Sequence, residues 1–404
     1  MVQTARLNRW VILACYALLA ACTQLLWLTF AAIDTDTARV LHTDTGTVGD
    51  LAAIFPLVYV VLALPAGRWL DSHFVPALAA GALLTAAGGL LRLIDTSSLL
   101  WQFIGQLVIA CGQPFVLNAI TKIAARHFPK RERAAAISVG SIALFAGILV
   151  AVLAAGPLFS AGGLRLMLVV EMVPTVAAAA LVLATLRTRP AYADNPSVSV
   201  NLRWLAHDRF MWLLAALIFV GMGTYNAIAT WLQPVLNNFG NGGAAGGLIA
   251  VMTVAGIVGA ALLPSFVAAR DRRRPMILFA LVVSVAVFAA MDLRHDTVWL
   301  GAWLFVAGFL LMACLPVVLD WSEVHAGAER SGSAAGFLLM AGNLGGVLLV
   351  LLVQAVMGAA YLPFAALAIV SLLAVPLAAR LPDRGRTELF TGAAPAIEVS
   401  GSAH

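Results

Sequence analysis

One carboxylate, Glu171, lies inside a long apolar stretch of the sequence, residues 164–186. A carboxyl group in an apolar medium can take up and release a proton. It is therefore a candidate for coupling the movement of protons to the movement of a solute across a membrane. The neighbouring Arg165 is about two helical turns away and reaches Glu171 only by bending along the helix. Glu171 is therefore the candidate coupling residue, and movement of a solute without protons is the alternative.

No set of residues has the spacing of a catalytic or metal site. His127 and His325 lie at the ends of apolar stretches, and the four cysteines lie inside such stretches, where they suit a packed core. We therefore expect no enzyme activity, no metal and no cofactor.

The composition assigns most of the chain to a membrane. Of its 404 residues, 62% are hydrophobic and 11% are charged, and the mean hydropathy is +0.98. Soluble domains are typically about half apolar and about a quarter charged. Because a soluble core could not bury this much apolar surface, lipid must surround most of it.

Twelve stretches have the length and composition of membrane spans, which need about 20 mostly apolar residues. The first is too long for a signal-peptide core and has no small-residue cleavage pattern after it. We expect an all-α membrane protein with spans at 10–33, 47–68, 74–94, 98–124, 134–159, 164–186, 209–234, 243–269, 275–293, 298–322, 332–358 and 360–380.

The positive charges predict the orientation of these spans. If the N-terminus and every second loop are cytoplasmic, that side receives twenty Lys and Arg residues. The other side receives only Arg39, Arg92, Arg165 and Arg294. Both termini are therefore predicted to be cytoplasmic. Since the arginines follow one membrane face, nucleic acid is not an expected partner.

A polar segment divides the chain into two similar halves. We expect a six-span bundle in 1–188, a cytoplasmic linker in 189–208 and a second six-span bundle in 209–381. The polar tail 382–404 is expected to be disordered. An even number of spans in each half predicts two parallel repeats, with a substrate site at their interface.

Two loops resemble those of the major facilitator superfamily, and the resemblance extends from about Arg9 to Leu381. The loop from Gly67 to Asp71 matches the Gly-x-x-x-Asp core of the family's signature loop, without the usual basic residues after it. Residues 126–134 resemble the family's loop between the fourth and fifth spans. The resemblance implies the major facilitator fold.

The signature loop predicts a latch between the halves. A carboxylate is favoured at a helix N-terminus by the unpaired N–H groups and the helix dipole. We expect Asp71 to meet the eleventh span near Ser331 and Ser333, and Asp271 to meet the fifth span near Ala134. The alternative is that both acids cap loops and pair with nearby arginines.

The expected cytoplasmic gate also contains a charge network. Asp320 and Glu323 are expected to interact with Arg330 and with the arginines at 270–274. The complete predicted gate is Gly67, Asp71, Arg126, Arg133, Asp271, Asp320, Glu323 and Arg330.

Several stretches are similar to one branch, the feline leukemia virus subgroup C receptor-related (FLVCR) family, which carries choline and ethanolamine and has also been assigned haem. The similar stretches are Arg9-Trp10, 24–27, 64–65, 69–71, 105–106, 113–117 and 336–339. The resemblance places the family's pocket residues at Trp27, Gln113, Tyr225 or its neighbour Asn226, and Asn343. At Asn343 this chain has an amide shorter than the family's glutamine.

These residue types suit a small amine or amino alcohol. Aromatic faces attract a quaternary ammonium group, and amides supply hydrogen bonds without a fixed charge. The alternative is that Trp27 and Tyr225 are packing residues and that the amides join helices.

We therefore expect a secondary transporter that moves a small organic solute by alternating access. A proton-coupled exporter of drugs or metabolites and a non-transporting membrane receptor are the alternatives. We expect a monomer in the lipid bilayer of the plasma membrane. The excess of arginine over lysine and the abundant alanine favour a bacterial source.

Overall fold

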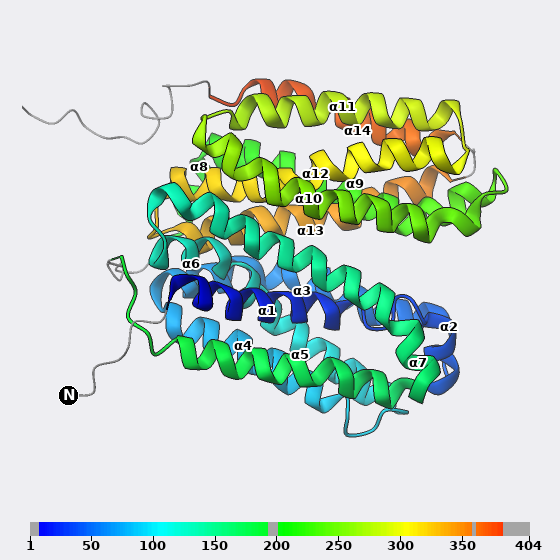
Figure 1. Ribbon diagram of the computed structural model, residues 1–404, viewed down its shortest axis with the longest axis horizontal. Helices are drawn as coiled ribbons and strands as arrows, with labels where there is room; N and C mark the ends of the chain where they lie inside the picture. The colour runs from blue at the N-terminus through cyan, green and yellow to red at the C-terminus, as the bar shows by residue number, and fades with distance from the viewer. Residues whose placement is uncertain (1–7, 193–200, 358–360, 383–404) are drawn as a thin grey trace, which may run out of the picture.

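The computed structural model describes residues 8–192, 201–357 and 361–382, which contain helices and turns and no β-strand. The helices run along one long axis in two bundles that lie side by side (Figure 1). Residues 193–200 of the predicted linker and 383–404 of the predicted tail lie outside the described residues.

The order of the helices follows the two predicted halves. The first bundle contains α1 (Arg9–Trp27), α2 (Asp34–Val40), α3 (Thr45–Ser72), α4 (Phe74–Leu91), α5 (Leu99–Leu117), α6 (Ala119–His127) and α7 (Arg133–Thr185). The second contains α8 (Arg203–His207), α9 (Arg209–Asn237), α10 (Ala245–Ala269), α11 (Arg273–Leu293), α12 (Thr297–Ala326), α13 (Ser331–Val356) and α14 (Leu362–Ala379).

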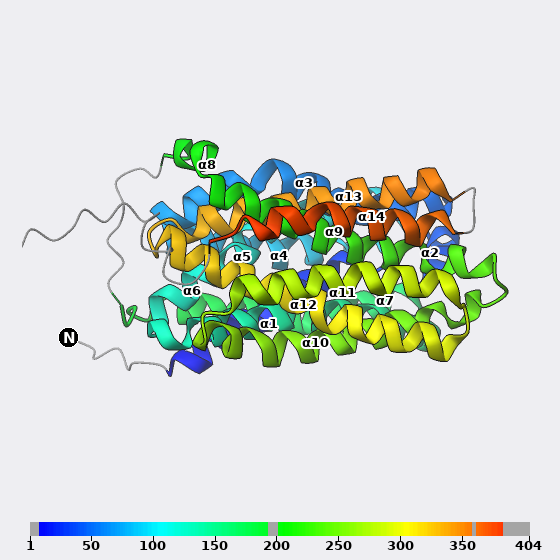
Figure 2. The same cartoon turned by 90° about the horizontal axis from the view of Figure 1, so that it is seen from above.

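The two ends of the molecule differ. One end carries α2 and is called the α2 end. The other end carries α6, α8, the start of α1 and the finish of α14 (Figures 1 and 2). We call it the latch end, after the contacts described below.

The long helix α7 contains two membrane crossings. Gly162 and Gly163 are not helical, and Gly163 has a φ of 68°, a conformation that favours glycine. After this turn the chain runs back beside α4 (Figure 1). Eleven helical segments of the described residues are long and apolar enough to cross a membrane, so the doubled segment gives the twelve predicted spans.

The helix caps and the apolar outer surface agree with the assignment of these helices as membrane spans. Asp44, Asp208 and Asp296 cap α3, α9 and α12, because each carboxylate accepts a hydrogen bond from the N–H group three residues later. On the outer faces, Leu57 is 60% exposed and Val173 is 67% exposed. Such apolar outer faces favour contact with lipid over contact with water.

Two predicted spans are interrupted in the structure. The first was predicted over 10–33, but α1 ends at Trp27, and Thr29 turns its hydroxyl to the carbonyl of Leu26 and the carboxylate of Glu171. The fourth, predicted over 98–124, breaks at Asn118, whose amide bonds to Tyr59 and to the Ala63 carbonyl. At the first break the Thr29 side chain bonds to the local backbone, and at the second the Asn118 side chain bonds to α3.

Equivalent glycines allow close helix contacts within each half. A Cβ atom on Gly147 would overlap the backbone of Ala21, which brings α7 against α1. A Cβ atom on Gly345 would overlap the backbone of Phe219, which brings α13 against α9. The offset is 198 residues for both members of the pair, as expected for a repeat.

Substituting alanine for Gly147 should destabilise the protein, because the added methyl group would overlap the backbone of Ala21. Overpacking costs about 1–3 kcal/mol, so we expect a lower midpoint of thermal unfolding in detergent. Gly156→Ala is the matched control, since Gly156 lies on the same helix and no atom lies within 4 Å of its Cβ position. Equal midpoints for the two variants would contradict this contact.

Candidate functional site

A cavity of about 770 Å³, including its opening, lies between the two bundles. Five helices besides α1 form its wall, and both bundles contribute. The lining residues are Gln24, Trp27, Gln113, Leu117, Leu144, Phe145, Ile148, Gly221, Met222, Tyr225, Asn226, Leu311, Met312, Leu315, Leu339 and Asn343. All five residues that the resemblance assigned to a pocket are among them.

The two aromatic residues are anchored in equivalent ways. The Trp27 indole N–H donates to the Ala52 carbonyl of α3 at 2.9 Å, and the Tyr225 hydroxyl lies 3.2 Å from the Thr253 hydroxyl of α10. Each polar tip is therefore engaged by the neighbouring helix of its own bundle. A ligand in the cavity meets the rings as aromatic surface, and Phe145 adds a third ring 6.5 Å from Tyr225.

The amides of the cavity retain most of their hydrogen-bonding capacity. Asn343 donates to the Leu339 carbonyl at 2.9 Å. Within the described part of the chain, the side chains of Gln24, Gln113 and Asn226 have no hydrogen-bond partner. Since all three side chains line the cavity, their amide groups are available to a polar ligand or to water.

The described residues of the cavity wall carry no fixed charge. Among the described residues that line it, none is Asp, Glu, Lys, Arg or His. The wall therefore combines aromatic and aliphatic surface with neutral amides.

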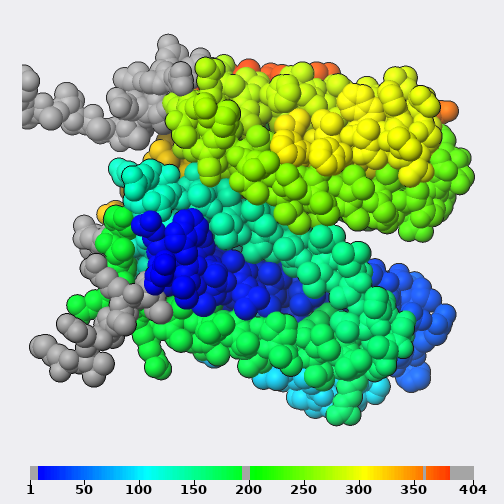
Figure 3. Space-filling view, viewed as in Figure 1, coloured from blue at the N-terminus to red at the C-terminus, as the bar shows by residue number. Residues whose placement is uncertain are grey.

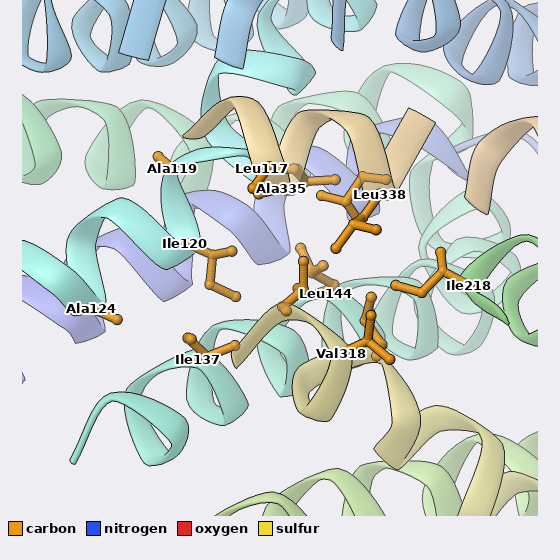
Figure 4. Packing of buried hydrophobic residues seen from close by; sticks show 14 of the residues in the cluster. Leu117, Ala119, Ile120, Ala124, Ile137, Leu144, Ile218, Val318, Ala335 and Leu338 are labelled. Carbon is orange, nitrogen blue, oxygen red and sulfur yellow. The ribbon is translucent and has the colours of Figure 1, made fainter. Parts of the chain in front are cut away.

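An apolar core closes the cavity toward the latch end. In Figure 4, buried side chains of α5, α6 and α7 point toward those of α9, α12 and α13. Leu117 and Leu144 belong both to this core and to the cavity wall, whereas Ile120, Ile137 and Leu338 belong to the core alone. On the face shown in Figure 3, the bundles touch at the latch end and a notch separates them at the α2 end.

Asp71 joins the two bundles at the latch end. Its Oδ1 accepts a hydrogen bond from the Gly332 N–H and its Oδ2 accepts one from the Ser333 N–H, each at 2.8 Å. Both groups belong to the first turn of α13. The side chains of Asp71 and Lys122 are fully buried, and the Lys122 Nζ lies 3.3 Å from Oδ1. The carboxylate thus meets the start of the eleventh span.

Two further features hold this end closed. The Lys122 Nζ donates to the carbonyls of Ala328 and Glu329, at 2.8 and 3.3 Å. A Cβ atom on Gly67 would lie 2.6 Å from the Gly332 carbonyl oxygen, so a larger residue would push α3 away from α13. Glycine at position 67 therefore permits the close approach that the Asp71 contact needs.

A second bridge lies beside the first. The Arg133 Nη1 lies 2.6 Å from the Glu323 Oε1, and the Thr121 hydroxyl donates to the Ser331 carbonyl at 2.9 Å. Among the described residues, all hydrogen bonds and ion pairs between the bundles lie at the latch end. Elsewhere in the described part of the interface, the bundles meet through an apolar core.

The contact predicted for Asp271 is absent. Its carboxylate is half exposed and pairs with Arg273, only two residues away, at 3.2 Å. Arg133, at the start of the fifth span, is already engaged by Glu323. The prediction was wrong because the local arginine captures the acid, which is the alternative named above for this residue.

Asp320 and Glu323, which were predicted to share one charge network, pair with different arginines. Asp320 pairs with Arg273, at 2.7 Å and 2.9 Å from two guanidinium nitrogens, as expected for the arginines at 270–274. Glu323 pairs with Arg133 instead of Arg330.

Two arginines of the predicted gate lie on aromatic rings instead. The Arg330 guanidinium lies 5.4 Å from the Trp204 ring centroid, and the Arg126 guanidinium lies 4.5 Å from that of Phe74. Both rings belong to the same bundle as their arginine. These two residues therefore contact rings on their own side of the interface.

Glu171 lies in the first bundle and does not line the cavity. Its Oε2 accepts a hydrogen bond from the Thr29 hydroxyl at 2.8 Å and lies 3.3 Å from the Arg92 Nη2. Arg92 also donates to Thr29 and to Gln106, at 3.0 and 3.3 Å. The partner is therefore Arg92 rather than the neighbouring Arg165, and the cluster holds the chain two residues after Trp27.

Sequence reasoning missed three residues of this arrangement. Lys122 and Arg92 each lie within a predicted span, where a charged residue signals a specific partner. Gln24 lies in the stretch 24–27 and was not assigned to the pocket. For Lys122 and Arg92, the signal in the sequence was a charged residue inside a predicted span.

The sequence matches the family model of the Major Facilitator Superfamily over residues 12–350. Solute carrier family 49 member A3 of Danio rerio is 29% identical over 373 residues, which cover 86% of this chain and 78% of the relative. The choline/ethanolamine transporter flvcr2b of Danio rerio is 22% identical over 378 residues, covering 84% and 76%.

Solved structures share the fold. The human organic anion transporter MFSD10 superposes with a TM-score of 0.76 at 12% identity, covering 92% of this chain and 100% of that chain. A bacterial homologue of the iron transporter ferroportin gives a TM-score of 0.74 at 15% identity, with 92% and 98% coverage. The family and these relatives are transporters, not enzymes. The chain therefore belongs to the Major Facilitator Superfamily.

Proposed function

We propose that this transporter moves a small organic amine, such as choline or ethanolamine, by alternating access through the cavity between its bundles. The observation that carries the proposal is the wall itself: two anchored aromatic residues from opposite bundles, unpartnered amides and no fixed charge among the described lining residues. The relationship to flvcr2b, a choline/ethanolamine transporter, supports the same class of substrate.

The chemistry of the wall fits an ammonium group with a hydroxyl. A cation over a desolvated aromatic face gains about 2 kcal/mol or more. The open amides of Gln24, Gln113 and Asn226 can bind the hydroxyl. Because the described lining residues include no carboxylate, such a substrate is held without a fixed counter-ion and can leave when the site opens.

The rival reading is a proton-coupled exporter of drugs or metabolites, which predicts a large apolar pocket, an essential buried acid and outward movement. Glu171 is a buried acid, but the described lining residues of the cavity include none. The anchored aromatic rings and open amides of the wall favour the amine transporter.

We propose that the latch end faces the cytoplasm of a plasma membrane. The start of α1 and the end of α14, the first and last described helices, lie at this end (Figure 1). The predicted excess of positive charge supports the cytoplasmic assignment. The closed latch and the notch at the α2 end then correspond to an outward-facing state.

Glu171 is proposed to act on the end of α1. Protonating its carboxylate would remove the charge that holds Arg92 and weaken the bond from Thr29. Since Thr29 follows Trp27 by two residues, this change would release the segment that carries the aromatic wall of the site.

Trp27→Ala should abolish most saturable choline uptake into proteoliposomes. Losing about 2 kcal/mol of cation–π attraction corresponds to roughly 30-fold in kcat/KM. Trp27→Phe should retain part of the activity. Trp299→Ala is the matched control, because its indole N–H also donates to a backbone carbonyl of a neighbouring helix, away from the cavity.

The outcomes separate the three functions. Uptake that is unchanged in Trp27→Ala removes the assignment of this residue to the substrate site. Proton-dependent efflux of varied apolar drugs, without amine uptake, supports the exporter. Binding of a ligand with no flux of any solute supports a receptor.

Glu171→Gln should make amine uptake insensitive to a proton gradient, whereas the wild type should respond several-fold. Glu132→Gln is the control, since Glu132 pairs with Arg9 outside the cluster. A second variant, Arg92→Gln with Glu171→Gln, removes both charges and tests whether an unpaired arginine merely impairs folding. Equal uptake with and without a gradient, in the wild type and Glu171→Gln alike, would refute coupling through this residue.

A further inference from the structure

A second hollow lies on the outer side of the second bundle at the latch end. It is formed by α8, the first turns of α9 and the last turn of α14 with the residues after it, which lie near one another in Figure 2. It contains about 1350 Å³ of empty space, including its open side, and shares no lining residue with the central cavity. We call it the α8 groove.

Two arginines of the α8 groove are available to an anion. Arg209 opens α9 and Arg380 directly follows α14, and both line the groove with exposed side chains. Neither side chain has a hydrogen bond or an ion pair with any described residue.

The acid next to Arg209 does not neutralise it. The Asp208 Oδ2 lies 2.7 Å from the His325 Nε2, and its Oδ1 accepts a hydrogen bond from the Met211 N–H. The described residues that line the groove include no acid. The charge balance of the groove is therefore positive.

The remainder of the groove wall is apolar. Trp212, Leu213 and Leu377 extend from the two arginines along α9 and α14, and Trp212 is 54% exposed. A tryptophan beside basic residues at the ends of membrane-spanning helices is typical of the level of lipid headgroups. A soluble anion would use the arginines but leave this apolar wall uncovered.

We propose that the α8 groove binds an anionic phospholipid, with its phosphate between Arg209 and Arg380 and an acyl chain along Trp212, Leu213 and Leu377. Basic pockets between helices on the cytoplasmic side are suited to such headgroups. The bilayer supplies this ligand at high local concentration, and the headgroup and chain match the two parts of the groove. The site is independent of the proposed amine substrate.

Retention of lipid by the full chain, measured by native mass spectrometry after titration in detergent, tests the proposal. The wild type should retain phosphatidylglycerol at least fivefold better than phosphatidylcholine. Arg209→Gln with Arg380→Gln should lose this preference. Arg131→Gln with Arg187→Gln is the matched control, because it removes two exposed positive charges of the first bundle, one between α6 and α7 and one just after α7.

Further results decide whether the α8 groove binds an anionic phospholipid. Arg380→Gln alone, outside the spans, should weaken phosphatidylglycerol retention about twofold or more even if the double variant folds poorly. Equal loss of the preference in the control variant would indicate a general effect of charge and overturn the site. Inorganic phosphate that displaces phosphatidylglycerol at equal concentration would show a soluble-anion site and also overturn the proposal.

Discussion

A buried carboxylate at the junction of the two bundles constrains the arrangement of the whole molecule. Asp71 accepts hydrogen bonds from two N–H groups in the first turn of α13, and Lys122 compensates its charge while binding the loop before that helix. A buried charge is tolerated only when its partners are in place. The contact therefore requires α3, α6 and α13 to meet closely, and it fixes one end of the interface.

The rest of the interface follows from this one-sided attachment. Between described residues, hydrogen bonds and ion pairs cross the interface at the latch end only, and the other cross-contacts are apolar. Apolar surfaces can slide and separate without leaving polar groups unpaired. The molecule can thus open at the α2 end while the polar contacts persist, and opening the latch end requires those contacts to break together.

The division of charge also explains the character of the cavity. Among the described residues, buried charged groups lie at the latch end and in the Arg92–Glu171 pair within the first bundle, and the cavity wall has none. A neutral wall with aromatic rings can bind a cation moderately and release it. A full counter-ion in the same place would bind more tightly and slow the release of the substrate.

Much of the fold was predictable because lipid imposes a simple rule on the sequence. Every backbone group of a span must be bonded internally, so long apolar stretches and flanking arginines indicated the twelve spans. The contact of Asp71 with α13 was predictable because a helix N-terminus offers N–H groups to an acid.

The contacts that could not be predicted from the sequence depend on which side chains the fold brings together. Glu171 pairs with Arg92, which is 79 residues away and was assigned to the outer side of the membrane without a partner. The end of α1 at Trp27 depends on Thr29 meeting that same cluster. Asp271 resembled Asp71 by position, but Arg273 lies close enough to capture it. Sequence spacing indicates which residues occupy equivalent positions in the two halves. Which partner each residue contacts depends on the charged side chains near it in the structure.

Distances between paired spin labels at both ends of the interface test the account most directly. In a cysteine-free background, one pair at Ser72 and Glu329 reports the latch end, and a second pair at Thr45 and Asn238 reports the α2 end. Asp71→Asn should lengthen the first distance and shorten the second in a large fraction of molecules. Unchanged distributions at both ends, or lengthening at both ends together, would contradict the claim that the Asp71 contact decides which end is open.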